Sequence, residues 1–116
     1  MSRPASERRN ELRRRLTMAG SNPVIVTAGV LPRAALLSDV SSLGLGMLTT
    51  FAPPVGSVLP VWLPGRPGEP SDLALVDVIH VRPSTASLYH VGTACHDEGS
   101  VATLRDFVTR LGVSEQ

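Results

Sequence analysis

Short runs of valine, leucine and alanine recur along the chain, and turn-forming residues separate them. Runs of this length are typical of β-strands, and they predict six: 24–27, 33–40, 45–51, 58–63, 73–82 and 87–96. Glycine and proline cluster between the runs, and the longest cluster, at 64–70, predicts a loop. Pro60 lacks a backbone donor, so the fourth strand is expected to lie at a sheet edge or to contain a bulge.

The fifth run is the longest strand candidate. Side chains alternate along a strand, which places four of its apolar residues on one face: Leu73, Leu75, Ile79 and Val81. Residues 83–86 predict a turn, after which 87–96 returns as the antiparallel partner. Trp62 is the only tryptophan, and its position in an apolar strand predicts that it lies in the core.

The period of the pattern changes near the end of the chain. Four apolar residues follow the i, i+3, i+4, i+7 spacing of an amphipathic helix: Leu104, Phe107, Val108 and Leu111. Ser100 is the expected N-cap of this helix, and Gly112 is the expected stop. Six short strands followed by one helix predict an all-β fold, either a small antiparallel barrel or a sandwich, with the helix as a lid.

Length and composition predict one domain. The 116 residues are 42% hydrophobic but only 3% aromatic, so the core must be built from aliphatic side chains. The single cysteine, Cys95, excludes an intrachain disulfide and a multi-cysteine zinc site. The longest apolar stretch, 23–32, is half the length of a membrane span, and no signal peptide is evident. We therefore expect a cytoplasmic protein that does not insert into membranes.

Charge divides the chain into an arm, 1–22, and a barrel-like body, 23–116. All 11 basic residues are arginines; six of them, with two acids, give the first 15 residues a charge of +4, and the other 101 residues carry −3. The arm has too few apolar residues to form a stable helix by itself, so we expect it to be flexible until a ligand holds it. Arginine suits phosphorylated or aromatic ligands because its planar fork binds anions and its face stacks on rings. A solubilising tail, or arginine usage set by a GC-rich genome, is the alternative explanation.

Two short motifs carry the candidate chemistry. The first is an R-x-x-x-R formed by Arg9 and Arg13. The second is a D-x-S-x-x-G at the end of the second predicted strand, formed by Asp39, Ser41 and Gly44. Asp39 and Ser41 alternate with Val40 and therefore share a face. An Asx or serine turn that closes the strand would explain the second motif without any ligand.

In this order and spacing, the motifs resemble the PilZ domain family, whose members are receptors for the bacterial second messenger cyclic di-GMP. The segment Tyr89-His90-Val91-Gly92 is similar to the late Tyr-x-Val-Gly strand of that family. The resemblance covers most of the chain and implies a six-stranded antiparallel barrel with a C-terminal helix. It implies a receptor or adaptor that acts through a protein partner and needs no cofactor beyond the nucleotide.

The resemblance also implies roles for single residues. Arg9 and Arg13 would grip the phosphates and the guanines, and Asp39 would hydrogen-bond a guanine. Ser41 would share that task, and Gly44 would keep the turn open. Arg8 stands where members with an additional arginine tend to accept two intercalated nucleotides, which favours a ligand dimer.

The chain departs from the family pattern in two places. Cys95 stands where the late strand of the family continues to a phenylalanine, so one aromatic core residue is lost. The stretch 14–23 lacks a recognisable strand directly after the second arginine, which leaves the anchoring of the arm open.

Other function classes fit the sequence less well. Cys95, His96 and Asp97 are adjacent, and neighbours in a strand point to opposite faces, so they cannot form a catalytic relay; we expect no enzyme. The histidines at 80, 90 and 96 match no zinc-site spacing, and we expect no metal. Nucleic-acid binding is disfavoured by the acidic body and the scarcity of stacking aromatics. The remaining alternative is a divergent adaptor of the same fold that does not bind the nucleotide.

Overall fold

All six predicted strands are present, and each lies within three residues of its expected bounds. The computed structural model describes residues 14–15, 23–41 and 43–111, and the following account concerns these. The strands are β1 (Arg14–Arg15), β2 (Pro23–Ala28), β3 (Leu31–Ser41), β4 (Gly44–Thr49), β5 (Val58–Leu63), β6 (Asp72–Thr85) and β7 (Leu88–Cys95). One helix, α2 (Glu98–Leu111), follows them.

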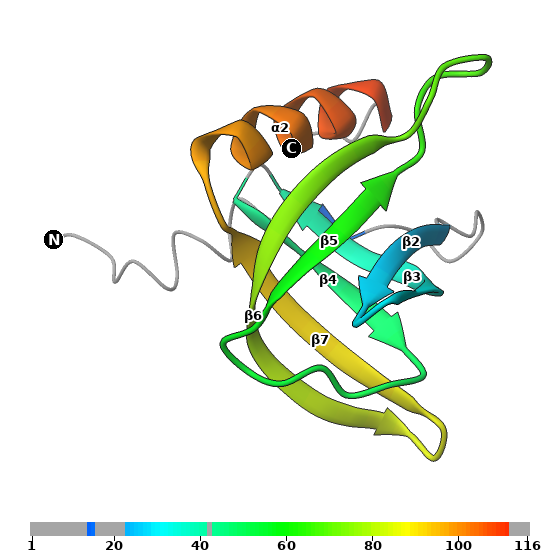
Figure 1. Ribbon diagram of the computed structural model, residues 1–116, viewed down its shortest axis with the longest axis vertical. Coiled ribbons are helices and arrows are strands. Elements are labelled where there is room, and N and C mark those ends of the chain that lie inside the picture. The colour runs from blue at the N-terminus through cyan, green and yellow to red at the C-terminus, as the bar shows by residue number, and fades with distance from the viewer. Residues whose placement is uncertain (1–13, 16–22, 42, 112–116) are drawn as a thin grey trace, which may run out of the picture.

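Six of the strands form a closed antiparallel barrel (Figure 1). Their hydrogen-bonded order is β3-β2-β5-β6-β7-β4, and β4 pairs back with β3 to close the ring. The first half of β3 pairs with β2, whereas its second half pairs with β4 on one edge and with the short β1 on the other. Closure leaves the barrel strands without long unpaired edges, and the expectation of a six-stranded barrel with a C-terminal helix is confirmed.

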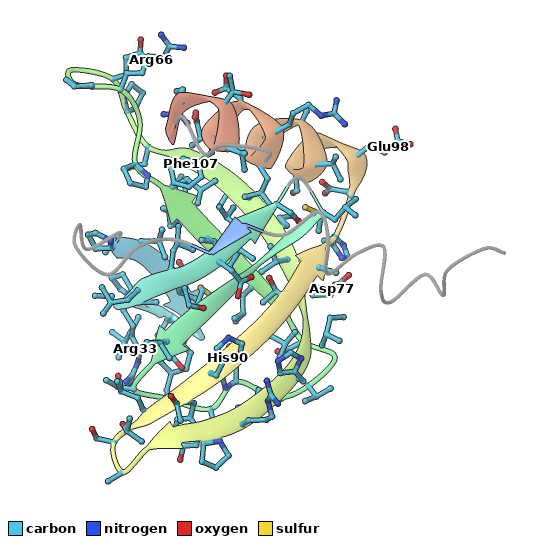
Figure 2. The ribbon with its side chains drawn as sticks, turned by 180° about the vertical axis from the view of Figure 1, so that it is seen from behind. Arg33, Arg66, Asp77, His90, Glu98 and Phe107 are labelled. Carbon is cyan, nitrogen blue, oxygen red and sulfur yellow. The ribbon has the colours of Figure 1, made fainter. Side chains whose placement is uncertain are left out.

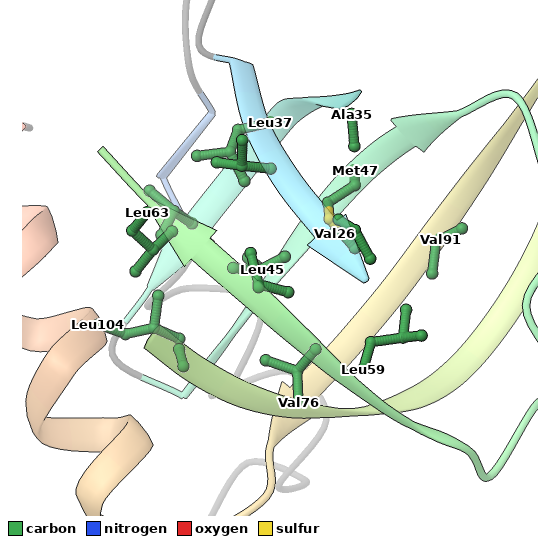
Figure 3. Packing of buried hydrophobic residues seen from close by; sticks show 14 of the residues in the cluster. Val26, Ala35, Leu37, Leu45, Met47, Leu59, Leu63, Val76, Val91 and Leu104 are labelled. Atoms are coloured by element: carbon green, nitrogen blue, oxygen red, sulfur yellow. The ribbon is translucent and has the colours of Figure 1, made fainter. Parts of the chain in front are cut away.

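Aliphatic side chains fill the barrel, as the composition required. The fully buried residues come from every barrel strand and include Val26, Leu37, Leu45, Met47, Val61, Val76 and Val91. Figure 3 shows buried side chains of this cluster converging inside the barrel, with Leu104 reaching them from α2. At 0% to 5% exposure each such side chain contributes about 1.5–3 kcal/mol of hydrophobic stabilisation, so no large aromatic residue is needed.

The helix α2 covers one end of the barrel (Figure 1). Leu104 and Phe107 are buried in the common core, and Val108 packs against it. In the last turn of the helix, the Arg110 guanidinium forms an ion pair with Asp72 at 3.0 Å. It also donates a hydrogen bond to the Pro64 carbonyl oxygen at 3.0 Å. These contacts join the helix to both ends of the loop between β5 and β6. No helix among the described residues is long and apolar enough to span a bilayer.

The prediction for the faces of β6 is wrong. The core side is formed by Ala74, Val76 and Val78, whereas Leu73 and Ile79 are exposed on the outside. A register shift between Val78 and His80 inserts one residue, and beyond it Val81 packs against the core. The four apolar residues therefore do not share one face, because the bulge reverses the alternation. The sequence pattern alone does not identify the buried face of β6, because apolar residues lie on both faces of this strand.

Trp62 also lies outside the core, contrary to expectation. The Trp62 side chain lies on the outer face of β5 and is 38% exposed. In the sheet Trp62 pairs with Ile25 of β2 on one side and with Leu73 of β6 on the other. Pro60 precedes it in the part of β5 that pairs with β6 alone, since β2 reaches only Val61 and Trp62. The expectation that proline confines β5 to an edge-like position is thus met locally.

Asp97, rather than the expected Ser100, is the N-cap of α2. Its Oδ1 accepts the backbone N–H of Ser100 at 2.7 Å. Ser100 lies inside the first helical turn, and its hydroxyl accepts the backbone N–H of Leu75 at 2.8 Å, which ties the helix to β6. The Ser100 backbone N–H and then its hydroxyl lower the pKa of Asp97 below the ordinary value of 3.8. The helix ends at Leu111, and Gly112 lies outside the described residues.

This cap predicts a pH-dependent contribution to stability. The pKa of Asp97 is lower in the folded chain than in the unfolded chain, so its ionisation stabilises the fold above about pH 4. The contribution is lost as the pH falls from there through the folded-state pKa. Asp97→Ala is expected to lower the melting temperature by a few degrees at about pH 7. Asp97→Asn keeps the cap without the charge, so the gap in melting temperature between it and the parent should narrow as the pH falls below about 4. A gap that is independent of pH would contradict the assignment.

Candidate functional site

A bulge in β3 turns Asp39 to the outside of the barrel. Ala35 and Leu37 are buried, so strict alternation would point Asp39 into the core as well. The register with β4 shifts between Leu37 and Asp39, and Ser38 is the extra residue. Val40 then takes the core position and is fully buried. Asp39 therefore lies on the outer side of β3, and the regular pairing that follows places Ser41 in alternation with Val40 on the same side of the strand, as predicted.

Asp39 belongs to a row of residues that crosses five strands. The pairings run from Arg15 of β1 to Asp39, then to Gly46 of β4, Gly92 of β7 and His80 of β6. A Cβ on Gly46 would lie 2.5 Å from Asp39 Oδ2, and one on Gly92 would overlap the His80 imidazole. The carboxylate and the imidazole thus lie flat on the sheet over the two glycines, and they do so because neither glycine has a side chain.

His90 lies near both polar side chains of this row, Asp39 and His80. Its Nε2 lies 4.0 Å from Asp39 Oδ2 and 3.4 Å from Ser38 Oγ, and Ser38 Oγ lies 3.4 Å from the same carboxylate oxygen. The His80 and His90 rings are nearly parallel, with centroids 5.5 Å apart. Figure 2 shows His90 on β7, in the middle of the face that β3 and β4 also form. No group of three or more potential metal ligands occurs within the described part of the chain.

Sequence reasoning did not include Ser38, His80 or His90 among the site residues. The histidines attracted attention as potential metal ligands, and His90 also as part of the segment 89–92, whereas Ser38 belongs to neither motif. A sequence signal existed in the spacing of His90 and Gly92, which puts both on one face of β7. The contact of His90 with Asp39, however, depends on the bulge in β3, and the sequence pattern does not predict that bulge.

Ser41 is held inside the turn that follows β3. Its hydroxyl accepts the backbone N–H of Leu43 at 3.1 Å and lies 3.4 Å from the Gly44 carbonyl oxygen, to which it donates. The residue is 3% exposed. These are the contacts of a serine turn that closes a strand, so this explanation accounts for Ser41 in the present structure. Its contact with a ligand stays a prediction.

Gly44 has a structural role in addition to the one expected from its motif. It is not among the described residues with positive φ, which are Gly29, Gly56 and Gly68. A Cβ at Gly44 would instead overlap the backbone carbonyl of Thr93 and lie 2.9 Å from the Cα of residue 94. The glycine therefore lets β4 and β7 approach closely, and any role in keeping the turn open for a ligand stays a prediction.

A short strand follows the second arginine of the R-x-x-x-R motif, contrary to the expectation that none is present. In β1, Arg14 pairs with Val40 and Arg15 pairs with Asp39. Two arginines give no strand-like pattern, so this pairing could not be read from the sequence. The pairing attaches the end of the arm to the segment of β3 that carries Asp39. Arg8, Arg9 and Arg13 lie outside the described residues.

The residues of the rejected catalytic relay have other partners. His96 Nδ1 lies 2.8 Å from Asp77 Oδ1, and Asp97 caps the helix. Cys95 packs against the barrel core at the end of β7. The three side chains therefore serve separate structural contacts.

Comparison of the whole structure with solved structures identifies the fold. The PilZ domain with c-di-GMP of YcgR from Escherichia coli aligns with a TM-score of 0.65 at 13% identity, over 86% of this chain and 88% of that chain. The Bacillus subtilis inhibitor of motility MotI/DgrA aligns with a TM-score of 0.62 at 11% identity, over 87% of this chain and 49% of that chain. The chain has the fold of a PilZ domain. No family model and no curated protein matches the sequence, so the PilZ assignment rests on the arrangement of the strands and the helix.

The close backbone contact at Gly44 gives this residue a structural role that can be tested in the absence of any ligand. Gly44→Ala is expected to destabilise the PilZ fold by about 1–3 kcal/mol, because the new methyl group meets backbone rather than a side chain that can move. Chemical denaturation of the variant and the parent measures this difference. Gly29→Ala is the matched control for backbone strain, since its Cβ would meet nothing within 4 Å and only its φ of 67° is unfavourable. A Gly44→Ala variant as stable as the parent would contradict this role.

Proposed function

We propose that the protein is a PilZ-type receptor that binds cyclic di-GMP between its arginine-rich arm and the outer face of the barrel at Asp39. The observation that carries the proposal is the pairing of Arg14 and Arg15 with Val40 and Asp39. It attaches the arm to the one place on β3 where an acidic side chain faces outward. The similarity to the PilZ domain of YcgR, described with c-di-GMP, supports the same ligand class.

The spacing of the arm fits this arrangement. Arg13 is joined by one peptide bond to Arg14, the residue opposite Val40, so its backbone is within about 4 Å of the paired segment. Arg9 is four residues further along the arm. Two guanidinium groups at this spacing can grip the two phosphates of a cyclic dinucleotide, and their planes can stack on guanine.

Asp39 supplies the complementary group. Guanine presents an N1–H and an exocyclic amine on one edge, and an ionised carboxylate is an acceptor that pairs with both. Asp39 lies on the strand and is 18% exposed, so its position is fixed by the barrel. The ligand is thus held from a rigid side by Asp39 and from the arm by arginine. Binding then ties the arm to the barrel, and its position relative to a protein partner becomes the signal.

An adaptor that does not bind the nucleotide is the second candidate. Ile25, Trp62 and Leu73 form an exposed apolar row across β2, β5 and β6, which is unusual for the outside of a barrel and is typical of a protein contact. The structural similarity to the inhibitor of motility MotI/DgrA is compatible with this candidate. A titration that shows no nucleotide binding would favour it.

Calorimetric titration with cyclic di-GMP tests the proposal. Arg9→Ala, Arg13→Ala and Asp39→Ala are each expected to weaken binding roughly 10- to 100-fold, the scale of a hydrogen bond to a charged group. Arg105→Ala removes an exposed arginine of α2 and is the matched control, with affinity unchanged. GTP and cyclic GMP serve as control ligands. Parent-like affinity in either arm variant would show that the arginine roles are wrongly assigned.

Salt provides an independent test of the arginine contacts. A doubly charged nucleotide held by guanidinium groups should bind more weakly as ionic strength rises, because mobile ions screen the attraction. The dependence of the dissociation constant on salt should be shallower in Arg13→Ala than in the parent. Equal slopes for the two proteins would indicate that Arg13 does not contact the phosphates.

A further inference from the structure

We infer that His90 and Ser38 are positioning residues, which hold Asp39 as a hydrogen-bond acceptor toward the nucleotide. The inference rests on the proposed function and adds two residues that lie outside both sequence motifs. Its basis is the contact chain from the His90 ring through the Ser38 hydroxyl to the Asp39 carboxylate.

The direction of this chain follows from what each group can donate. An ionised carboxylate only accepts, so the Ser38 hydroxyl must donate its single proton to Asp39 Oδ2. Ser38 Oγ can then only accept from His90, at 3.4 Å, which requires a proton on Nε2. The 4.0 Å separation of Nε2 and Asp39 Oδ2 favours the same tautomer, since the N–H points its positive end at the carboxylate.

The surroundings of Nδ1, the other ring nitrogen of His90, also favour the tautomer with the proton on Nε2. Nδ1 of His90 is buried and has no hydrogen-bond partner among the described residues. A buried N–H without an acceptor is costly, and a charged imidazolium, which carries a proton on both nitrogens, would place one there. Asp39 of β3, together with His80 and Arg82 of β6, supplies the nearby titratable or charged groups on the strands around His90.

This arrangement prepares the carboxylate for a ligand. A carboxylate offers about four lone-pair sites, and the Ser38 hydroxyl donates to one of them, on Oδ2. The contacts of 3.4 Å are long, and they restrict the rotation of Asp39 without neutralising its charge. Loss of either positioning residue removes one of the contacts that orient the carboxylate, and we expect this loss to lower the affinity for the nucleotide.

Two isosteric substitutions of His90 provide the sharpest test. The amide nitrogen of glutamine occupies the place of Nε2, and that of asparagine occupies the place of Nδ1. His90→Gln is therefore expected to keep the affinity for cyclic di-GMP within about twofold, whereas His90→Asn and Ser38→Ala should weaken it about 3- to 10-fold, as for one neutral hydrogen bond. Ser38→Thr keeps the hydroxyl and should restore parent-like binding. Equal losses in His90→Gln and His90→Asn would overturn the inference.

Two controls distinguish positioning from general damage. In an Asp39→Ala background, His90→Asn should cause no further loss, because it acts only through the carboxylate. An additive loss in the double variant would overturn the inference. His96→Asn is the matched control: His96 also contacts an aspartate, Asp77 at 2.8 Å, but lies beyond the end of β7. It should leave the affinity unchanged.

A measurement on the free protein keeps this inference separate from the proposed function. The ¹⁵N chemical shifts of the His90 ring report which nitrogen carries the proton, and we expect Nε2–H in the parent near neutral pH. Ser38→Ala should shift the tautomer population toward Nδ1–H. A parent ring protonated on Nδ1 would overturn the inference whether or not cyclic di-GMP binds. Failure of the parent to bind the nucleotide, with the Nε2–H tautomer present, would instead overturn the proposed function alone.

Discussion

The candidate site depends on two β-bulges, one on each side of a four-stranded face. In β3 the extra residue is Ser38, and in β6 it lies between Val78 and His80. Without them, alternation would point both Asp39 and His80 into the core, where an unpaired charge is strongly unfavourable. Each bulge reverses the faces of its strand and turns a polar side chain outward. The core is preserved because Val40 and Val81 take the inward positions that follow.

The two strands between the bulges, β4 and β7, carry glycines beneath the polar side chains that the bulges turn outward. Gly46 and Gly92 are paired neighbours on β4 and β7, and their missing side chains leave room for the Asp39 carboxylate and the His80 ring. A larger residue at either position would push the polar group off the sheet. Fold and site are therefore specified together here: the glycines serve the polar side chains above them, whereas Gly44 serves the backbone contact with β7.

The sequence predicted the strands and the closing helix because their turns and periodicity are local features. The strand faces were predicted less well, since β5 and β6 are apolar on both sides: Trp62, Leu73 and Ile79 are exposed, and alternation alone cannot tell which side is buried. The motif singled out Asp39, but the contact of Asp39 with His90 joins residues 51 positions apart through a bulge, which no local pattern indicates. The cap at Asp97 was missed because both it and Ser100 are good N-caps, and only the contact of Ser100 with β6 decides between them.

A closed, densely packed barrel limits where a bound ligand can produce change. Every barrel strand is paired on both sides over part of its length, and aliphatic side chains fill the interior, so the face that carries Asp39 has little freedom to rearrange. In the proposed complex the nucleotide would also contact the arm, whose described end is attached to β3 by only two residue pairs. Two pairs are a weak attachment compared with the six pairs that join β2 to β3. On the proposed function, binding would therefore act mainly through the arm, and we expect a partner that distinguishes the bound form to contact the arm rather than the barrel alone.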